Sequence, residues 1–301
     1  MIRLGVVDFD TSHVVEFTRR LNHKGDDKEQ WVDGAEVVLG CPGESKLGPD
    51  RIPGFKKEME KLGVELVEKP ADLVGKVDGV LVESLEGGAH WERAKLYMEA
   101  GLPCYVDKPF ACSTADAKKM VELADKKKLP IFSASSLRYA PELADFLKDD
   151  KHGKIIGAEA YGPAPLSDSD TLNPGLFHYG IHAVEILYTL MGPGCQRVTC
   201  THEKDVDLAT GQWDDGRVGT VRGIRAGKAD YGCVVFAEKG VYPLALGTKY
   251  IYRELLKRVV SLFADKKPPL DAAVMVEVVA FIEAALKSGQ NHGAGEKVAA
   301  G

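Results

Sequence analysis

The first half of the chain alternates short apolar runs with segments of helical periodicity, and this alternation limits the possible folds more than any other feature. The intervening segments repeat apolar residues about every 3.6 positions, as amphipathic helices do. Such a β-α series predicts a Rossmann-type, doubly wound parallel sheet, whose ligands bind at the carboxyl ends of the strands where the strand order reverses. The runs are Ile2–Val7, Ala35–Gly40, Val64–Val67, Gly79–Glu83, Pro103–Val106 and Pro130–Ser133.

The pattern changes near Arg138, where longer runs of alternating polarity begin. They predict a mostly antiparallel open sheet that is covered by helices, because a lone sheet cannot bury its own apolar face. We therefore expect a Rossmann-type nucleotide-binding domain at 1–137 and an α+β substrate and oligomerisation domain at 138–301. The runs are Lys154–Tyr161, Gln196–His202, Leu208–Trp213, Val218–Ile224, Tyr231–Glu238 and Val241–Leu246, and the helices are Pro141–Lys148, Phe177–Met191, Tyr250–Ala264 and Ala272–Lys287.

Composition narrows the possible partners. The net charge of −6, without a stripe of Lys and Arg interleaved with aromatic residues, disfavours nucleic acid. No run approaches the roughly 18 apolar residues of a membrane span, and the start of the chain lacks the pattern of a signal peptide. The six cysteines include no C-x-x-C pair. We expect a cytoplasmic protein with reduced thiols and with neither a membrane nor a nucleic-acid partner.

The turn after the first strand is where a dinucleotide-binding fold needs glycines, because backbone amides approach the diphosphate there. In this chain Asp8, Asp10 and His13 occupy the three glycine positions. One hypothesis is that Thr11, Ser12 and His13 donate to a ligand. The alternative is that Asp10, Thr11 or Ser12 caps the following helix.

Two further turns carry charged candidates. After the second strand, Glu44 is a candidate partner for a ribose diol, and Ser45 with Lys46 for a 2′-phosphate, although a Pro-Gly turn alone explains the segment. The fifth strand ends in Asp107-Lys108-Pro109. A partly desolvated Lys108 next to Asp107 can bond a substrate hydroxyl; an ordinary surface lysine is the alternative.

The densest cluster of titratable groups is His178, His182 and Glu185, whose spacing puts them near one face of a helix. Acid/base chemistry is one interpretation, because histidine titrates near neutrality. A metal site with these three residues as ligands is a weaker one. The remaining alternative is one histidine in a cap or interface and the other in solvent.

Two motifs resemble the Gfo/Idh/MocA oxidoreductases. Within the stretch from Val77 to Glu142, Asp107-Lys108-Pro109 is similar to the family's E-K-P motif, and His90 matches the histidine that leads the preceding helix. The family's D-x-G-x-H-x-x-D signature, followed by a later glycine, is matched by Gly180, His182 and Gly192, with Glu185 and His178 in place of the two acids. The Asp-Thr-Ser-His turn at residues 10–13 is similar to that of a branch of the family.

The resemblance implies an NAD- or NADP-dependent oxidoreductase that acts on a sugar, a polyol or a similar small molecule. Lys108 and His182 are then the catalytic pair, with His178 as a third catalytic candidate. The implied substrate residues are Tyr139, Tyr161 and Glu185. The cofactor-site candidates are Asp10, Thr11, Ser12, His13, Ser84 and Lys108.

Two other functions stay open, because a fold does not fix a reaction. One is a lyase, hydrolase or isomerase on the same scaffold, with or without a metal. The other is a sugar-binding protein without catalysis. Both faces of the Tyr231–Glu238 run carry apolar residues, so we expect a homodimer or homotetramer formed through the second sheet.

Overall fold

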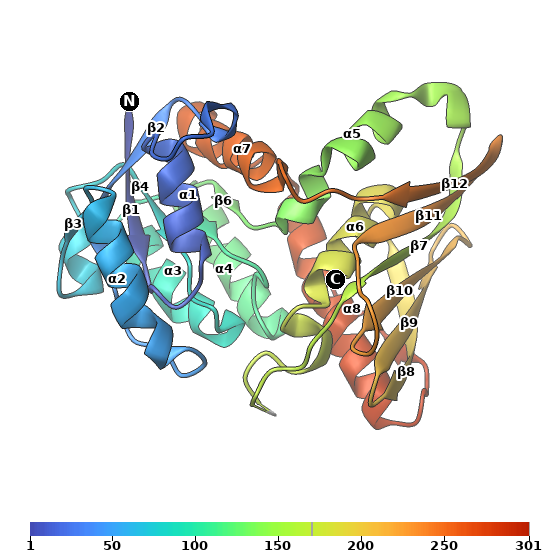
Figure 1. Cartoon of the computed structure of the whole chain (residues 1–301). Helices are drawn as coiled ribbons and strands as arrows, with labels where there is room; N and C mark the ends of the chain where they lie inside the picture. The colour runs from blue at the N-terminus through green and yellow to red at the C-terminus, as the bar shows by residue number, and fades with distance from the viewer. Residues whose placement is uncertain (170, 301) are drawn as a thin grey trace. The chain divides into compact units, whose positions relative to one another are not determined.

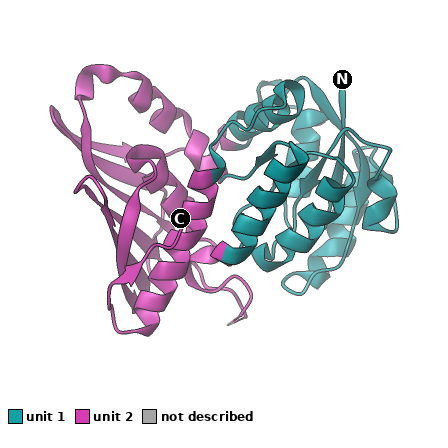
Figure 2. Cartoon of the chain, turned by 180° about the vertical axis from the view of Figure 1, so that it is seen from behind, with its two compact units in different colours: residues 1–111, 115–134, 252–272 teal, residues 112–114, 135–251, 273–301 magenta. Residues whose placement is uncertain are grey.

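The computed structural model describes residues 1–169 and 171–300, which form two compact units (Figure 2). Unit 1 contains residues 1–111, 115–134 and 252–272, and unit 2 contains residues 112–114, 135–251 and 273–301. Apart from the short stretch 112–114, the chain first passes from unit 1 to unit 2 at 134/135, close to the division at 137/138 expected from the sequence. Residues 252–272 differ from that division, because they pack with the first unit.

Unit 1 is built on a parallel sheet whose order, β3-β2-β1-β4-β5-β6, reverses direction between β1 and β4 (Figure 1). This confirms the predicted doubly wound sheet and puts its switch point at the carboxyl ends of β1 and β4. The strands are β1 (Ile2–Val7), β2 (Ala35–Cys41), β3 (Glu65–Leu66), β4 (Gly79–Val82), β5 (Cys104–Val106) and β6 (Ile131–Phe132).

The helices of this unit are amphipathic and cover the sheet. Helix α7 completes the covering although it lies far along the chain, and two glycines explain its close approach. A β-carbon at Gly79 would lie 2.3 Å from the Phe263 ring, and one at Gly34 would lie 2.7 Å from Val260. The helices are α1 (His13–Leu21), α2 (Ile52–Lys61), α3 (His90–Glu99), α4 (Thr114–Lys127) and α7 (Ile251–Asp265).

Unit 2 contains a sheet of order β12-β11-β7-β10-β9-β8-β13, in which only the β7–β10 pair is parallel among the described residues. The predicted, mostly antiparallel sheet is confirmed. The strands are β7 (Ile155–Pro163), β8 (Cys195–Glu203), β9 (Val206–Trp213), β10 (Val218–Ile224), β11 (Gly232–Ala237), β12 (Gly240–Ala245) and β13 (Glu296–Lys297).

One face of this sheet is covered by helices, and small residues on it let two of these helices approach closely. Helices α6 (Ile181–Met191) and α8 (Ala272–Gln290) lie on it, where Gly219 meets Leu187 of α6 and Gly211 meets Phe281 of α8 (Figure 1). A third helix, α5 (Pro141–Lys148), precedes the sheet. Because helices cover only this face, buried and exposed residues alternate along these strands.

The other face of the sheet carries large apolar side chains that the chain itself does not cover. They are exposed by between 37% and 61% and come from five different strands. These residues are Ile156, Leu208, Val218, Phe236 and Val241.

Helix α6 begins later than its apolar pattern suggests. A 3₁₀ turn occupies Gly175–Phe177, His178 follows it, and the helix itself starts at Ile181. The four-residue spacing of His178 and His182 is therefore not a helical spacing, and the expectation that both lie on one helix face is wrong. Crowding of Gly180 against Leu176, whose Cδ2 would lie 2.4 Å from an added β-carbon, accompanies the break.

Candidate active site

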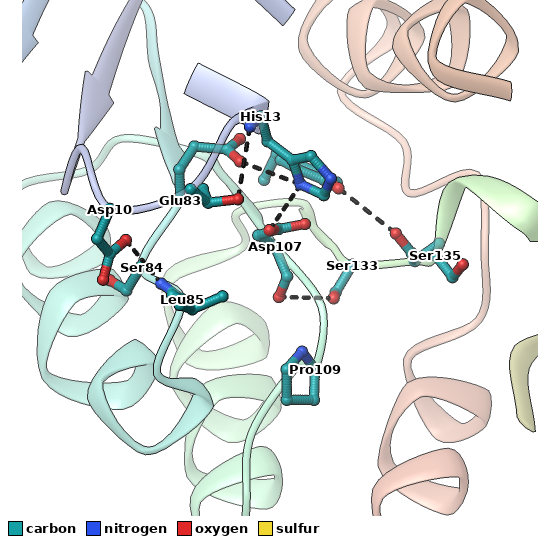
Figure 3. Close-up of polar contacts among 12 residues, drawn as sticks. Asp10, His13, Glu83, Ser84, Leu85, Asp107, Pro109, Ser133 and Ser135 are labelled. Carbon is teal, nitrogen blue, oxygen red and sulfur yellow. Dashed lines mark hydrogen bonds and ion pairs between the residues drawn. The ribbon is translucent and has the colours of Figure 1, made fainter. Parts of the chain in front are cut away.

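Four acidic or histidine side chains converge at the carboxyl edge of the unit 1 sheet (Figure 3). Asp10 and His13 follow β1, Glu83 follows β4 and Asp107 follows β5. All four are buried, with at most 7% of the residue exposed. The edge is the switch point of the sheet, which is where doubly wound folds bind their ligands.

Asp8 takes the first glycine position of the fingerprint and keeps the backbone conformation of a glycine. Its φ is +66°, in the left-handed region that few side chains adopt. Its Oδ2 accepts a hydrogen bond from Arg93 Nε at 2.7 Å and another from the Ser84 hydroxyl. Asp8 is thus tied to the β4 loop and to α3, and Arg93 balances its charge.

Asp10, at the second glycine position, also bonds across the sheet. The Leu85 N–H donates to Asp10 Oδ1 at 2.9 Å. Burial raises the pKa of Asp10, and hydrogen bonds from Ser45 and Leu85 partly oppose this. The carboxylate therefore serves the loop after β4 and does not cap α1.

The cap of α1 is weak. Ser12 is the N-cap residue, but its side chain makes no capping hydrogen bond. Thr11 Oγ1 accepts the His13 N–H at a long 3.4 Å. Of the three residues for which a capping role was considered, only Thr11 bonds a backbone amide at the start of the helix.

His13, at the third glycine position, is held by ring stacking and by a hydrogen bond to Asp107. Its ring stacks on Phe17 at 4.8 Å and meets Tyr252 edge-on at 5.2 Å. Nδ1–H donates to Asp107 Oδ2 at 2.8 Å. Burial by itself would raise the pKa of Asp107, but His13 and Lys108 outweigh it and lower the pKa to about 2. Asp107 is therefore a stable carboxylate.

Glu83 is fully buried, and neither of its carboxyl oxygens has a hydrogen-bond donor among the described residues. His13 Nδ1 lies 3.9 Å from Glu83 Oε2, too far for a hydrogen bond. Burial, reinforced by the charge of Asp107, raises the pKa of Glu83 well above its usual range, while Lys108 opposes the rise. An unpartnered buried carboxyl group needs an explanation in any folded protein.

Lys108 is 6% exposed and follows β5 directly, so it is not an ordinary surface lysine. His90 joins its loop to that of β4, because the imidazole lies between Ser84 O and Pro109 O, at 2.8 Å from each. Glu44 and Lys46, the candidates for a ribose or 2′-phosphate contact, are exposed on the turn after β2. His90 thus joins the loops after β4 and β5, and bonds of Asp8, Asp10 and His13 join the loop after β1 to both.

A second polar cluster lies in unit 2, around α6. His182 is buried, and its Nδ1 lies 2.6 Å from the Ser135 hydroxyl. Glu185 accepts from Arg138 Nε at 2.6 Å and from the Ser135 N–H at 3.3 Å. The Tyr231 ring meets the His182 ring edge-on at 5.7 Å. Ser135 therefore links the histidine to the ion pair of Glu185 and Arg138.

The remaining substrate candidates lie at different places in unit 2. Tyr139 ends the 3₁₀ turn Ser136–Tyr139, next to Arg138 of the second cluster. Tyr161 covers Gly232 of the neighbouring strand. Since Gly162 faces Ala183 of α6, strand alternation turns Tyr161 toward the opposite face of the sheet, away from His182.

The two clusters divide the candidates expected from the sequence. Unit 1 brings together the cofactor-site candidates around β1, β4 and β5, and unit 2 brings His182 and Glu185 together through Ser135. Sequence reasoning did not identify Glu83, Arg93, Ser135 and Arg138. Glu83 had one local signal, because it is an acid directly after the apolar run Gly79–Val82; the other three are recognisable only from their partners in space.

Part of the chain matches a known protein family. Residues 50–135 match the model of the Gfo/Idh/MocA family, described as an oxidoreductase family with an NAD-binding Rossmann fold. The match confirms, over these residues, the resemblance expected from the sequence. The Asp-Thr-Ser-His turn lies outside the matched residues, and its assignment to a branch of the family stays a prediction.

Individual relatives agree with this class. The rhizopine catabolism protein MocA of Rhizobium meliloti is 26% identical over 110 residues, which are 36% of this chain and 34% of that protein. A probable dehydrogenase from Thermotoga maritima has a similar structure, with a TM-score of 0.82, 19% identity and 99% coverage of both chains. Scyllo-inositol dehydrogenase from Lactobacillus casei, solved with NAD(H) and scyllo-inositol, gives 0.80, 14% and 99% of both chains.

The sequence matches and the structural matches cover different shares of the chain. The sequence match to MocA spans about a third of its length, whereas the structural matches span nearly whole chains and show the shared fold. Among the described residues, no helix has the length and apolar character to cross a membrane.

Proposed function

We propose that the chain is an NAD- or NADP-dependent oxidoreductase that acts on a sugar, a polyol or a similar small molecule. The observation that carries the proposal is the buried Lys108 at the carboxyl edge of the unit 1 sheet, next to the switch point. The family match, with its NAD-binding Rossmann fold, supports the cofactor class. The inositol complex of the Lactobacillus casei enzyme supports the substrate class.

The residues at the switch point fit the hydroxyl-bearing part of a dinucleotide. Asp8 Oδ1, Asp107 Oδ1 and both Glu83 oxygens are buried acceptors without donors among the described residues. Ribose hydroxyls and a carboxamide supply such donors. Asp8 is neutralised by Arg93, which reduces its repulsion of a diphosphate at the start of α1. A bound nicotinamide would supply the hydride acceptor or donor.

Lys108 would act on the substrate hydroxyl. An ammonium group in a partly desolvated site donates strong hydrogen bonds. In the direction of oxidation, Lys108 would therefore orient the hydroxyl and stabilise the oxygen as its proton leaves. The neighbouring carboxylate of Asp107 would help to hold the ammonium group in position.

His182 would be the second member of the pair, with Ser135 as its positioning residue. The Ser135 hydroxyl already accepts the Leu137 N–H at 3.1 Å, and it can either donate to His182 Nδ1 or accept from it. The imidazole can thus exchange a proton at Nε2 while its orientation is kept. Glu185 is bonded to Arg138, so we propose that it helps to hold Ser135 and His182 in place. Tyr139 and His178 would then contact the substrate.

The test is a titration of the purified chain with NADH and NADPH, followed by the change in nicotinamide fluorescence, and then a screen of polyols and sugars for turnover. We expect micromolar binding of at least one nucleotide and turnover of at least one polyol. Lys108→Met should abolish turnover while binding persists, and the exposed Lys126→Met should behave as the unaltered chain. If neither nucleotide binds, the proposal is overturned in favour of a non-redox enzyme or a sugar-binding protein.

We also propose that the chain forms a homodimer or homotetramer through the open face of the unit 2 sheet. Ile156, Val218, Phe236 and Val241 are exposed there on neighbouring strands. A contiguous apolar surface of this kind is typical of an interface. A second copy of the chain would bury it by a self-complementary contact.

A further inference from the structure

Three side chains of unit 1 have the composition and spacing of a metal site. One ligand atom from each of His13, Glu83 and Asp107 lies within 4.8 Å of the other two, and all three residues are buried. Within residues 1–169 and 171–300, no other three residues of the ligating types come together in this way. Figure 3 shows the three side chains pointing toward one another from the loops after β1, β4 and β5.

The distances are close to those around a bound ion. Metal–ligand bonds of about 2.0–2.2 Å hold neighbouring ligand atoms roughly 3 to 4 Å apart. His13 Nδ1 lies 2.8 Å from Asp107 Oδ2 and 3.9 Å from Glu83 Oε2. The ligand atoms of Glu83 and Asp107 lie within 4.8 Å of each other, so an ion would draw the three atoms together by side-chain rotation.

The unsatisfied oxygens are a second, independent observation. Glu83 is 0% exposed and has two oxygens without a donor, and Asp107 Oδ1 is in the same state. Burying an unpartnered carboxylate is unfavourable unless a cation or donors compensate for it. Three such oxygen atoms around one imidazole nitrogen provide more acceptor capacity than the surrounding protein uses.

We propose that His13, Glu83 and Asp107 bind one divalent cation of the Mn²⁺ or Zn²⁺ class. One imidazole nitrogen with carboxylate oxygens suits these ions, whereas Ca²⁺ and Mg²⁺ prefer ligand sets made of oxygen alone. The site requires no nicotinamide, but it uses oxygens of Glu83 and Asp107 that the proposed function offers to a dinucleotide, so an ion bound there would compete with those contacts. Bound at the switch point, the ion would lie where a ligand hydroxyl or carboxylate can complete its coordination.

Metal binding competes with the bond that His13 makes in the described structure. Nδ1–H donates to Asp107, so the ion must displace that proton before Nδ1 can act as a ligand. Binding at Nδ1 would therefore break the hydrogen bond between His13 and Asp107.

The experiment uses the full chain after dialysis against EDTA and then buffer. MnCl₂ and ZnCl₂ are titrated in by calorimetry, and bound metal is counted by elemental analysis after gel filtration. We expect one ion per chain, with a Kd that rises at least tenfold in Glu83→Gln and in His13→Asn. Glu65→Gln, an exposed acid on β3 of the same unit, should bind as the unaltered chain does.

Glu83→Gln keeps the shape of the side chain and breaks no hydrogen bond among the described residues, so it should fold; circular dichroism checks this, and Asp107→Asn is the replacement variant if it does not. Absence of binding by either ion, or equal binding in all variants, overturns the proposal. Nucleotide titration in EDTA separates the two hypotheses. NADH binding without any metal binding removes the metal site and leaves the oxidoreductase, and metal binding without nucleotide does the reverse.

Discussion

Asp8 and Gly43 fill one space between the ends of β1 and β2, since a β-carbon at position 43 would lie 1.9 Å from Asp8 Oδ1. Gly43 also has a φ of +65°, so two separate constraints require glycine there. The Pro-Gly turn after β2 thus accommodates the carboxylate that replaces the first fingerprint glycine. The Asp8 side chain thus occupies the space that a side chain at position 43 would need.

Replacement of Gly43 by alanine should lower the free energy of unfolding by about 2–4 kcal/mol, from backbone strain and steric overlap together. Gly63→Ala is the matched control, because Gly63 also has a positive φ but has no atom within 4 Å of an added β-carbon. Urea unfolding of both variants measures the difference. Equal losses in the two would mean that Asp8 does not constrain position 43.

The Glu83→Gln substitution should stabilise the EDTA-treated chain near neutral pH. Because burial raises the folded-state pKa of Glu83, its contribution is fully present below the unfolded value near 4.5 and is lost as the pH rises toward the folded pKa. Glutamine does not titrate. The advantage of the variant should thus be absent at pH 4 and should grow by about 1.4 kcal/mol per pH unit above 4.5 until the folded pKa is reached.

Thermal unfolding of the two proteins between pH 4 and pH 8, in EDTA, measures this dependence. A constant difference across the range would show that Glu83 titrates alike in the folded and unfolded chain. Glu65→Gln, on the exposed edge strand, should show no such trend.

Removal of the Ser135 hydroxyl should reduce kcat about tenfold with little change in KM, because His182 loses the hydrogen bond that orients it. Ser288→Ala is the control: Ser288 is equally buried and bonds the Cys200 N–H at 2.8 Å, but it does not contact His182. Both variants should lose about 1 kcal/mol of stability. Only Ser135→Ala should change the pH dependence of kcat, and identical pH profiles would reduce Ser135 to a structural residue.

Phe236→Asp should convert the proposed oligomer into a species of 32.6 kDa in light scattering, since a carboxylate on the open face of the unit 2 sheet cannot be buried against a second copy. Leu147 on α5 is similarly exposed, and Leu147→Asp should leave the mass unchanged. A monomeric unaltered chain would contradict the interface.

The strands were predictable because burial on one or both faces requires an alternating or a continuously apolar pattern, which is visible in the sequence. Val218–Ile224 has the predicted bounds, and β1 does as well. The start of α6 was not predictable, since the apolar pattern continues through Phe177 whereas the helix begins only at Ile181.

The site was only partly predictable for a related reason. The loops after β1 and β5 could be identified from local motifs, because both are short and highly polar. Arg93 bonds Asp8, which lies 85 positions away along the chain, and Ser135 bonds His182, which lies 47 positions away. No local pattern carries such a pairing.

The membership of α7 in unit 1 has a consequence for how the protein is made. Residues 1–134 leave the ribosome well before residues 252–272, so the face of the sheet at Gly79 lacks the Phe263 ring until that later segment has been synthesised. A nascent chain must keep this incomplete Rossmann unit from aggregating in the meantime. A premature stop codon anywhere before residue 252 would accordingly deprive both halves of the protein of part of their core.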